Sequence, residues 1–78
     1  MIYTYLLKSI EYQTYYTGIS KDPNKRLITH NKGKVYTTKF KKPWSLVYKK
    51  AHENYEQARK HEKWLKKKNH EYKDKLAG

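Results

Sequence analysis

The stretch YYTGIS, residues 15–20, decides the predicted fold because it returns alongside the strand that precedes it. That first strand is IYTYLL, residues 2–7, a run of β-branched, aromatic and apolar residues. The polar residues 8–13 lie between the two runs and predict a turn, so we expect a hairpin with strands over 2–7 and 14–19. Side chains alternate along a strand, and the faces are therefore predicted as Tyr3, Tyr5 and Leu7 on the first strand, and Thr14, Tyr16 and Gly18 on the second.

Tyrosine dominates the aromatic residues of this chain. There are nine tyrosines and one phenylalanine. A buried tyrosine must find a partner for its hydroxyl, so large aromatic cores are usually richer in phenylalanine. The composition therefore raises the question of what the hydroxyls face. Gly18 predicts either a bend in its strand or a place where another group approaches the backbone closely.

A helix is predicted directly after the hairpin. Asp22 can cap the free backbone amides, and Pro23 fits the first helical position, where no donor is needed. We expect this helix to run to about Asn31, and Gly33 supplies its stop.

The rest of the chain adds a loop, a strand and a second helix. Residues 32–43 form a basic loop, and WSLVYK, residues 44–49, predicts a third strand. Asn54, with Gln57 three residues later, resembles a capping box and predicts a helix of about 14 residues. Residues 69–78 are polar and predict either a short final helix or a frayed end.

This order of elements predicts an α+β fold with a small three-stranded antiparallel sheet flanked by helices. The 78 residues suffice for a single domain, residues 1–78. No seam of apolar heptads marks an interface between copies, so we expect a monomer. The absence of cysteine excludes a disulfide framework and a thiolate zinc site, and it is compatible with the cytoplasm. No apolar run approaches the ~20 residues that cross a bilayer, so we expect no membrane partner.

The net charge of +12, from 19 basic and seven acidic residues, indicates a polyanionic partner. Nucleic acid is the first candidate and an acidic membrane the second. The alternative is that the charge serves solubility alone, but solubility needs a net charge of only about 2–8 on a small domain. We expect nonspecific phosphate contacts from lysines in the loop and in the second helix, namely Lys39, Lys41, Lys42, Lys63, Lys66 and Lys67.

Glu62 breaks the pattern of the second helix. At 100° per residue, Tyr55, Ala58 and Leu65 define the core face, and Glu62 falls within the same arc. A carboxylate that faces a core is costly unless it is paired or binds a cation. Two interpretations stay open: an ion pair with a nearby lysine or arginine, or a ligand for a hard cation such as Mg²⁺, which often takes one carboxylate together with water and phosphate.

These residues form a series that resembles the GIY-YIG nuclease domain, in particular its small stand-alone, excision-nuclease-like bacterial members. The family's two named motifs stand here as YTY, residues 3–5, and YTG, residues 16–18. Arg26 and His30, which share a flank of the first helix, follow at the family's spacing, and the resemblance extends to about residue 68. The first motif lacks its glycine and isoleucine. Asn69 is too close to Glu62 to match the family's late polar residue with certainty.

The resemblance implies a divalent-metal-dependent endonuclease that hydrolyses DNA with low intrinsic sequence specificity. It implies Mg²⁺ or Mn²⁺ on Glu62, phosphate contacts from Arg26, and Tyr5 and Tyr16 as candidates for handling the proton of the attacking water. His30 would orient a tyrosine or accept its proton. A phenol has a pKa near 10, and we expect Arg26, the metal and the positive field to favour its ionised form.

Other aromatic residues have simpler interpretations. Tyr15 is expected in the core or on the sheet surface, and Trp44 and Trp64 are expected in the core, with base stacking as an alternative for Trp64. Three histidines lack metal-site spacing and are expected on the surface: His52, His61 and His70.

Two further functions remain alternatives to the nuclease. The first is a catalytically silent nucleic-acid-binding module with the same fold, and the second is a basic protein that binds RNA or the ribosome. The presence of Tyr5, Tyr16, Arg26, His30 and Glu62 favours the enzyme. A domain this small leaves no room for a separate DNA-reading domain, so a partner protein could supply targeting.

Overall fold

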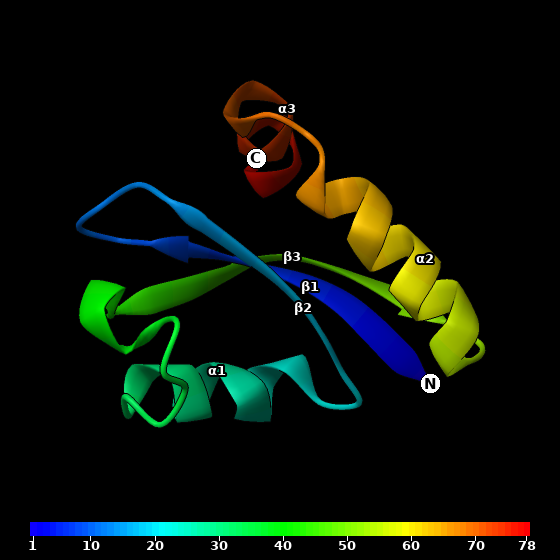
Figure 1. Ribbon diagram of the computed structural model, residues 1–78, viewed down its shortest axis with the longest axis horizontal. Coiled ribbons are helices and arrows are strands. Elements are labelled where there is room, and N and C mark those ends of the chain that lie inside the picture. Colours follow the sequence, from blue (N-terminus) through cyan, green and yellow to red (C-terminus); the bar gives the residue numbers. More distant parts are fainter.

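A computed structural model describes residues 1–78 and confirms the α+β class. The strands are β1 (Ile2–Ser9), β2 (Tyr15–Ser20) and β3 (Trp44–His52). The helices are α1 (Pro23–Asn31), α2 (Tyr55–Lys66) and α3 (His70–Ala77), and a 3-10 turn, η1 (Lys39–Lys41), lies in the basic loop (Figure 1). The sheet lies between α1 on one side and α2 and α3 on the other.

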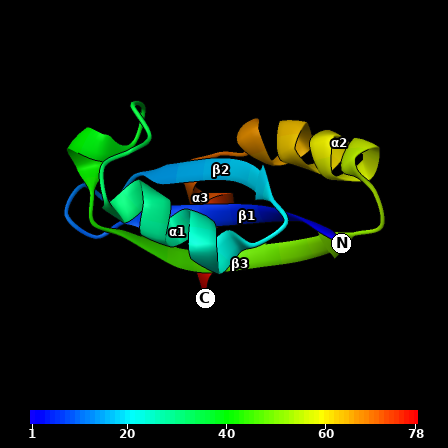
Figure 2. The same ribbon diagram turned by 90° about the horizontal axis from the view of Figure 1, so that it is seen from below.

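Strand β1 is central in an antiparallel sheet with the order β2-β1-β3. In the hairpin, Tyr5 pairs with Gly18 and Leu7 pairs with Tyr16, so these four side-chain positions share a face, as the alternation predicted. On the other side of β1, Leu7 pairs with Leu46, and a bulge between Leu6 and Leu7 shifts the register. Strand β2 is therefore one edge of the sheet and β3 is the other (Figure 2).

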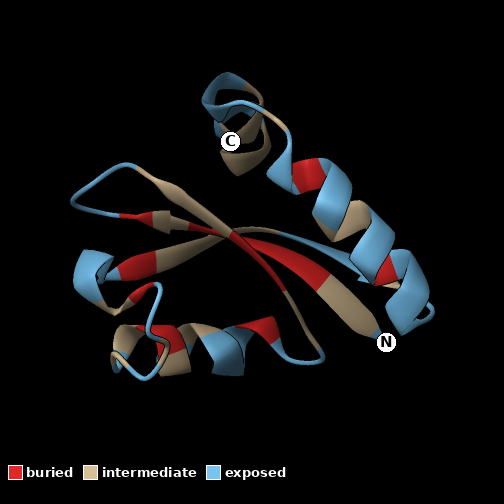
Figure 3. Ribbon diagram, viewed as in Figure 1, coloured by how far each residue is buried: buried red, intermediate tan, exposed pale blue.

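Each face of the sheet buries its own set of side chains. Beneath α1, Tyr5, Leu7 and Trp44 form the core cluster, with partly buried apolar side chains packed around it. On the opposite face, the Thr4 hydroxyl donates to the Ala58 carbonyl oxygen of α2 at 3.3 Å. Figure 3 shows burial concentrated along β1, with buried positions on both helical layers.

The helix starts follow the predicted caps. The Asp22 carboxylate accepts a hydrogen bond from the Lys25 amide at 3.1 Å, and the Asn54 side chain accepts from the Gln57 amide at 2.9 Å. After α1 the chain turns at Gly33 with a φ of 77°, a conformation that glycine adopts without a steric penalty.

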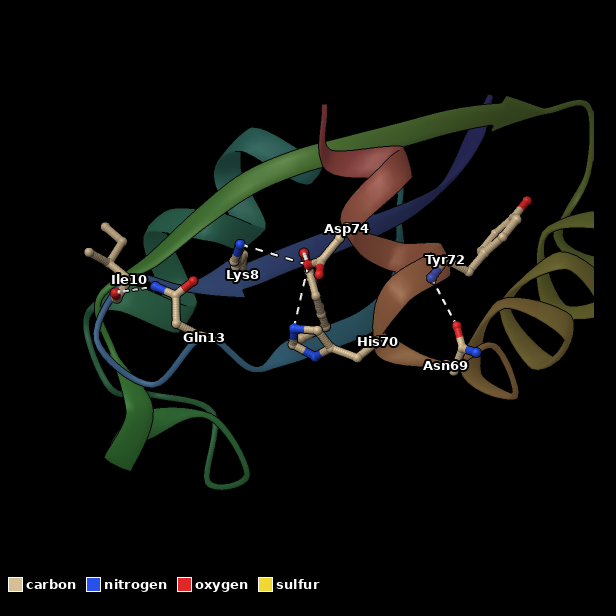
Figure 4. A network of polar contacts seen from close by, with 8 residues as sticks. Lys8, Ile10, Gln13, Asn69, His70, Tyr72 and Asp74 are labelled. Carbon is tan, nitrogen blue, oxygen red and sulfur yellow. Dashed lines mark hydrogen bonds and ion pairs between the residues drawn. The ribbon is translucent and has the colours of Figure 1, made fainter.

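Eight of the last ten residues, His70–Ala77, form a helix, which resolves the choice between a helix and a frayed end. The Asn69 side chain caps α3 by accepting from the Tyr72 amide at 2.9 Å. Asp74 then anchors α3 to the sheet: Lys8 lies 3.9 Å and His70 3.4 Å from the carboxylate, and the Tyr15 hydroxyl donates to it (Figure 4). Tyr15 is thus a structural contact on the sheet surface.

Two expectations about α2 were wrong. Trp64 is 42% exposed, because it lies on the flank of α2, where His61, Tyr72 and Lys68 contact only part of the indole. Tyr55 is also exposed, at the first turn of α2, where it contacts Arg59 instead of the core.

His52 and His61 are not surface residues but partly buried in the contact between α2 and the sheet. Their ring centroids lie 5.0 Å apart, and the Thr4 hydroxyl oxygen is 3.0 Å from the His52 Nε2 atom. Pairing of Ile2 with His52 extends β3 beyond the predicted end at residue 49. None of the three helices has both the length and the apolar character needed to cross a bilayer.

Candidate active site

The candidate site is built around the Tyr5 ring, which lies against the edge strand β2. Tyr5 is 1% exposed. Its hydroxyl and ring carbons occupy the space above Gly18, where a β-carbon would come within 2.5 Å of the hydroxyl oxygen. Of the two roles predicted for Gly18, close approach by another group is therefore the correct one. The missing side chain at position 18 allows the phenol to reach the β2 edge.

A chain of buried hydrogen bonds extends from Tyr5 through α1 to the basic loop. The Tyr5 hydroxyl lies 3.1 Å from His30 Nε2, and His30 Nδ1 lies 2.7 Å from the Thr38 hydroxyl. The Thr38 hydroxyl also lies 3.4 Å from the Val35 carbonyl oxygen, and when it donates its proton there it accepts from Nδ1. In that arrangement the hydrogen of His30 is on Nδ1 and the Nε2 lone pair accepts from Tyr5.

Tyr16 lies beside this pair on the same face. Its ring centroid is 4.9 Å from that of His30 and 6.4 Å from that of Tyr5. Unlike Tyr5, Tyr16 is only partly buried, so solvent reaches its side chain. The structure thus brings both tyrosines of the predicted site together with His30.

Arg26 and Glu62 both act electrostatically on Tyr5, although they come from opposite layers of the fold. Burial and the neighbouring Tyr16 raise the pKa of Tyr5 to about 12, and the carboxylate of Glu62 acts on it in the same direction. The Arg26 guanidinium, through its donor groups and its charge, opposes this rise in the pKa. Loss of hydration on burial therefore outweighs the arginine in setting the pKa of Tyr5, and the contribution expected from a bound metal stays a prediction.

His30 is fully buried and neutral at physiological pH. Burial lowers its pKa, and the charge of Arg26 lowers it further. A neutral imidazole with its Nε2 lone pair directed at a hydroxyl is suited to accept a proton.

Glu62 satisfies part of each interpretation given to it. Its side chain is 18% exposed, and its Oε2 atom forms an ion pair with Lys66 at 3.4 Å, one turn further along α2. The Oε1 atom makes no ion pair, and the negative charge of Glu62 contributes to the raised pKa of Tyr5. No group of three metal-ligating side chains occurs. The single carboxylate of Glu62 fits a cation such as Mg²⁺, which often binds one carboxylate and otherwise water and phosphate.

The predicted phosphate-contacting lysines belong to two segments of the chain, which lie near opposite ends of β2. Lys39, Lys41 and Lys42 belong to the loop with η1, and Lys63, Lys66 and Lys67 belong to α2 or its end. Figure 2 shows the loop and α2 both at this edge of the sheet, toward opposite ends of it. A shallow pocket beside Arg26 adds further basic groups, lined by Ser20, Lys21, Asp22, Lys25, Arg26 and Thr29.

Thr38 is a site residue that the sequence did not reveal. It is 1% exposed, and besides holding His30 it accepts a hydrogen bond on its carbonyl from the Trp44 indole at 2.9 Å. A threonine in a lysine-rich loop carries no pattern that predicts burial, so only the folded contact identifies it.

Comparison with known proteins places this arrangement in a family. A family model described as the GIY-YIG catalytic domain matches residues 1–75, and the chain belongs to this family, which is a family of nuclease domains. The chain is 39% identical over 66 residues to a UPF0213 protein of Streptococcus pyogenes serotype M3, an alignment that covers 83% of this chain and 71% of that protein.

Two further matches lie in the same group. A UPF0213 protein of Staphylococcus epidermidis is 42% identical over 52 residues, covering 65% of this chain and 63% of that protein. The solution NMR structure of a UPF0213 protein from Bacillus halodurans matches with a TM-score of 0.57 and 29% identity, over 97% of this chain and 82% of that chain. Within the nuclease domain family, the chain is therefore similar to the small UPF0213 proteins.

Proposed function

We propose that this protein is a divalent-metal-dependent endonuclease that hydrolyses DNA phosphodiester bonds with little sequence preference of its own. The observation that carries the proposal is the contact of Tyr5 with the His30 imidazole of α1, beside Tyr16; the charges of Arg26 on α1 and Glu62 on α2 support it, because both act on the pKa of Tyr5. Hydrolysis of a phosphodiester needs a means to orient water, a proton acceptor and positive charge on the phosphate.

Arg26 contacts the scissile phosphate in this proposal. It is exposed, it stays charged at every relevant pH, and it opens onto the basic pocket that also includes Lys21 and Lys25. Its planar guanidinium can donate two hydrogen bonds to phosphate oxygens, where negative charge accumulates as water attacks.

The two tyrosines take different roles because their exposure differs. Tyr5 is enclosed and already bonded to His30, whereas Tyr16 remains partly open to solvent. We assign the contact with the attacking water to Tyr16. The released proton passes to the Tyr5 hydroxyl, which gives its own proton to the Nε2 atom of the neutral His30 imidazole, and Thr38 holds that imidazole at Nδ1.

Glu62 is the residue that would hold the metal ion. Bound Mg²⁺ or Mn²⁺ would supply Lewis acidity at the phosphate. Nucleases of this family generally use a divalent metal, and the single half-enclosed carboxylate fits such an ion. Lys66 competes with the cation for Oε2, so metal affinity should be modest.

The test is cleavage of supercoiled plasmid, branched DNA and single-stranded DNA with and without Mg²⁺ or Mn²⁺, comparing wild type with Glu62→Ala. The matched control is Glu56→Ala, because Glu56 lies on the same helix and also pairs with a lysine four residues later, at 3.6 Å, but is 79% exposed. We expect metal-dependent cutting that Glu62→Ala abolishes and Glu56→Ala retains, with DNA binding unchanged in both.

A catalytically silent nucleic-acid-binding module is the second candidate, and the Glu62–Lys66 ion pair is the observation that favours it. In that case wild type and Glu62→Ala bind DNA equally and neither cuts any substrate with any divalent metal. Equal cutting by both proteins would instead remove Glu62 from the site. An RNA substrate panel under the same conditions tests whether RNA is the substrate.

A further inference from the structure

We propose that Tyr36 and Phe40, in the basic loop, form a stacking platform for an unpaired nucleotide next to the active site. This inference rests on the proposed function in one respect, namely that the site acts on a polynucleotide. It goes further by naming the part of the substrate that the loop recognises: a nucleobase that is not paired, together with its phosphate.

The two rings are exposed to a degree that folding does not explain. Tyr36 is 74% exposed and Phe40 is 70% exposed. They contact each other edge to face, with centroids 6.1 Å apart, and neither belongs to the buried cluster beneath α1. Rings this exposed add little to the stability of the fold, so an available apolar face of this kind indicates a binding surface.

Charge in the same loop specifies a polyanion as the occupant. Residues 34–42 contain four lysines and no acidic residue. Lys39 lies over both rings, with its Nζ atom 5.0 Å from the Tyr36 centroid and 4.9 Å from the Phe40 centroid. An incoming phosphate can draw this ammonium away from the rings and free their faces for a base. Aromatic faces combined with lysines are the combination that binds single strands, where the bases are free to stack.

Thr38 places the platform at the site. It lies two residues from both Tyr36 and Phe40, and its hydroxyl holds His30. Two residues span at most about 7 Å of chain, so the backbone that carries both rings is tied to the residue that holds the imidazole. In Figure 2 this loop and α2 are both at the β2 edge, so a strand bound along that edge would meet the loop at one end and α2, the helix that carries Glu62, at the other.

Duplex DNA cannot use this platform, because its bases stack on one another and present no free face. The inference therefore assigns the substrate class as polynucleotides with unpaired nucleotides, such as single strands, flaps and junctions. The base-stacking chemistry is common to DNA and RNA, so the experiment includes both.

The test measures binding in EDTA, where no metal-dependent cutting occurs, by fluorescence anisotropy of a labelled single-stranded DNA, the matching duplex and the matching RNA. The variant is Tyr36→Ala with Phe40→Ala. The matched control is Tyr55→Ala, which removes another exposed ring with a cation over it, on α2. Thermal unfolding should be unchanged in both, since all three rings are exposed.

We expect the double variant to lose roughly tenfold in affinity for at least one single strand and almost nothing for the duplex. Tyr36→Phe, which keeps the ring, should bind like wild type, and 2-aminopurine placed in the strand should be quenched by wild type and not by the double variant. The polymer with the larger loss identifies the natural ligand.

Unchanged affinity for both single strands, or an equal loss on single strand and duplex, would overturn the platform. These results do not depend on catalysis. If the wild-type protein never cuts but the double variant loses single-strand affinity, the platform is supported and the nuclease proposal is refuted. If the wild-type protein cuts but the double variant loses no affinity, the nuclease proposal is supported and the platform is refuted.

Discussion

The Tyr5 hydroxyl lies 2.5 Å from the position that a β-carbon on Gly18 would occupy. The enclosed ring cannot swing away, because it is packed in the core and bonded to His30. We predict that Gly18→Ala lowers the free energy of unfolding by about 1–3 kcal/mol, as overpacked cores do, and strongly reduces cleavage because Tyr5 leaves His30. Urea denaturation and plasmid cleavage measure the two effects.

A double-mutant cycle provides the control for this prediction. In a Tyr5→Leu background the ring is gone, so adding Gly18→Ala should cost much less than it does in wild type. Equal costs in the two backgrounds would show that the alanine acts on β2 itself and not on the Tyr5 ring.

Substitution of Tyr5 and of Tyr16 by phenylalanine should affect stability and activity differently. Tyr5→Phe leaves the buried Nε2 atom of His30 without a donor, so it should cost about 1–3 kcal/mol of stability as well as activity. Tyr16→Phe removes a partly exposed hydroxyl and should leave the melting temperature nearly unchanged while cleavage falls roughly 100-fold. Steady-state cleavage rates and thermal melts measure the two effects. Full activity of Tyr16→Phe would show that the Tyr16 hydroxyl does not contact the attacking water.

The phenols of Tyr5 and Tyr15 should lose their protons at a higher pH than ordinary tyrosines do. Burial, followed by Tyr16, raises the pKa of Tyr5 to about 12, and burial, followed by the hydrogen bond to Asp74, raises the pKa of Tyr15 to about 12. The unfolded chain ionises its phenols near pH ~10, so the stability from these groups is complete below that pH and is lost as the pH rises toward ~12. Absorbance titration of wild type should show both of these late phenols, together with a contribution from Tyr48, whose pKa is also raised by burial.

Tyr5→Phe and Tyr15→Phe should each remove one of these late-titrating groups, and Tyr12→Phe, in the exposed turn, should remove neither. If all nine tyrosines ionise together near pH ~10 in the folded protein, the burial of Tyr5 described here is wrong.

Affinity for DNA should fall steeply with salt. If five or six phosphates are engaged, a plot of log affinity against log salt concentration should have a slope of about −4 to −6. Replacing Lys39, Lys41 and Lys42 by glutamine should make the slope shallower by about 0.9 for each phosphate that is no longer neutralised. The matched change at Lys49 and Lys50, on the opposite edge strand β3, should leave the slope nearly unchanged. A flat salt response would argue against a phosphate-binding surface.

Local patterns in the sequence predicted the architecture well. Alternation along residues 2–7 predicted that Tyr5 and Leu7 share a face, which the structure shows to carry the core cluster, and the caps at Asp22 and Asn54 set the starts of two helices. These features depend on near neighbours in the chain, so the sequence contains them directly. The spacing of four between Arg26 and His30 likewise requires only the helix itself.

What the sequence could not supply depends on contacts between distant segments. Thr38 becomes buried only because His30 and Trp44 meet it, and Trp64 stays exposed because its ring meets only the side chains of α2, α3 and the segment between them. Projection on a helical wheel treats a helix as if its whole length were covered, which also misplaced Tyr55 at the open first turn. Burial, not charge, then decided the direction of the Tyr5 pKa.

Few residues fix the helices to the sheet. Helix α1 contributes Pro23 and His30 as buried residues, α2 contributes Ala58 and Leu65, and α3 contributes none. Warming should therefore open α3 first, while α1 and the α2 helix that bears Glu62 stay in place. Helical signal would then begin to fall before cleavage does, because the C-terminal segment carries none of the reacting groups.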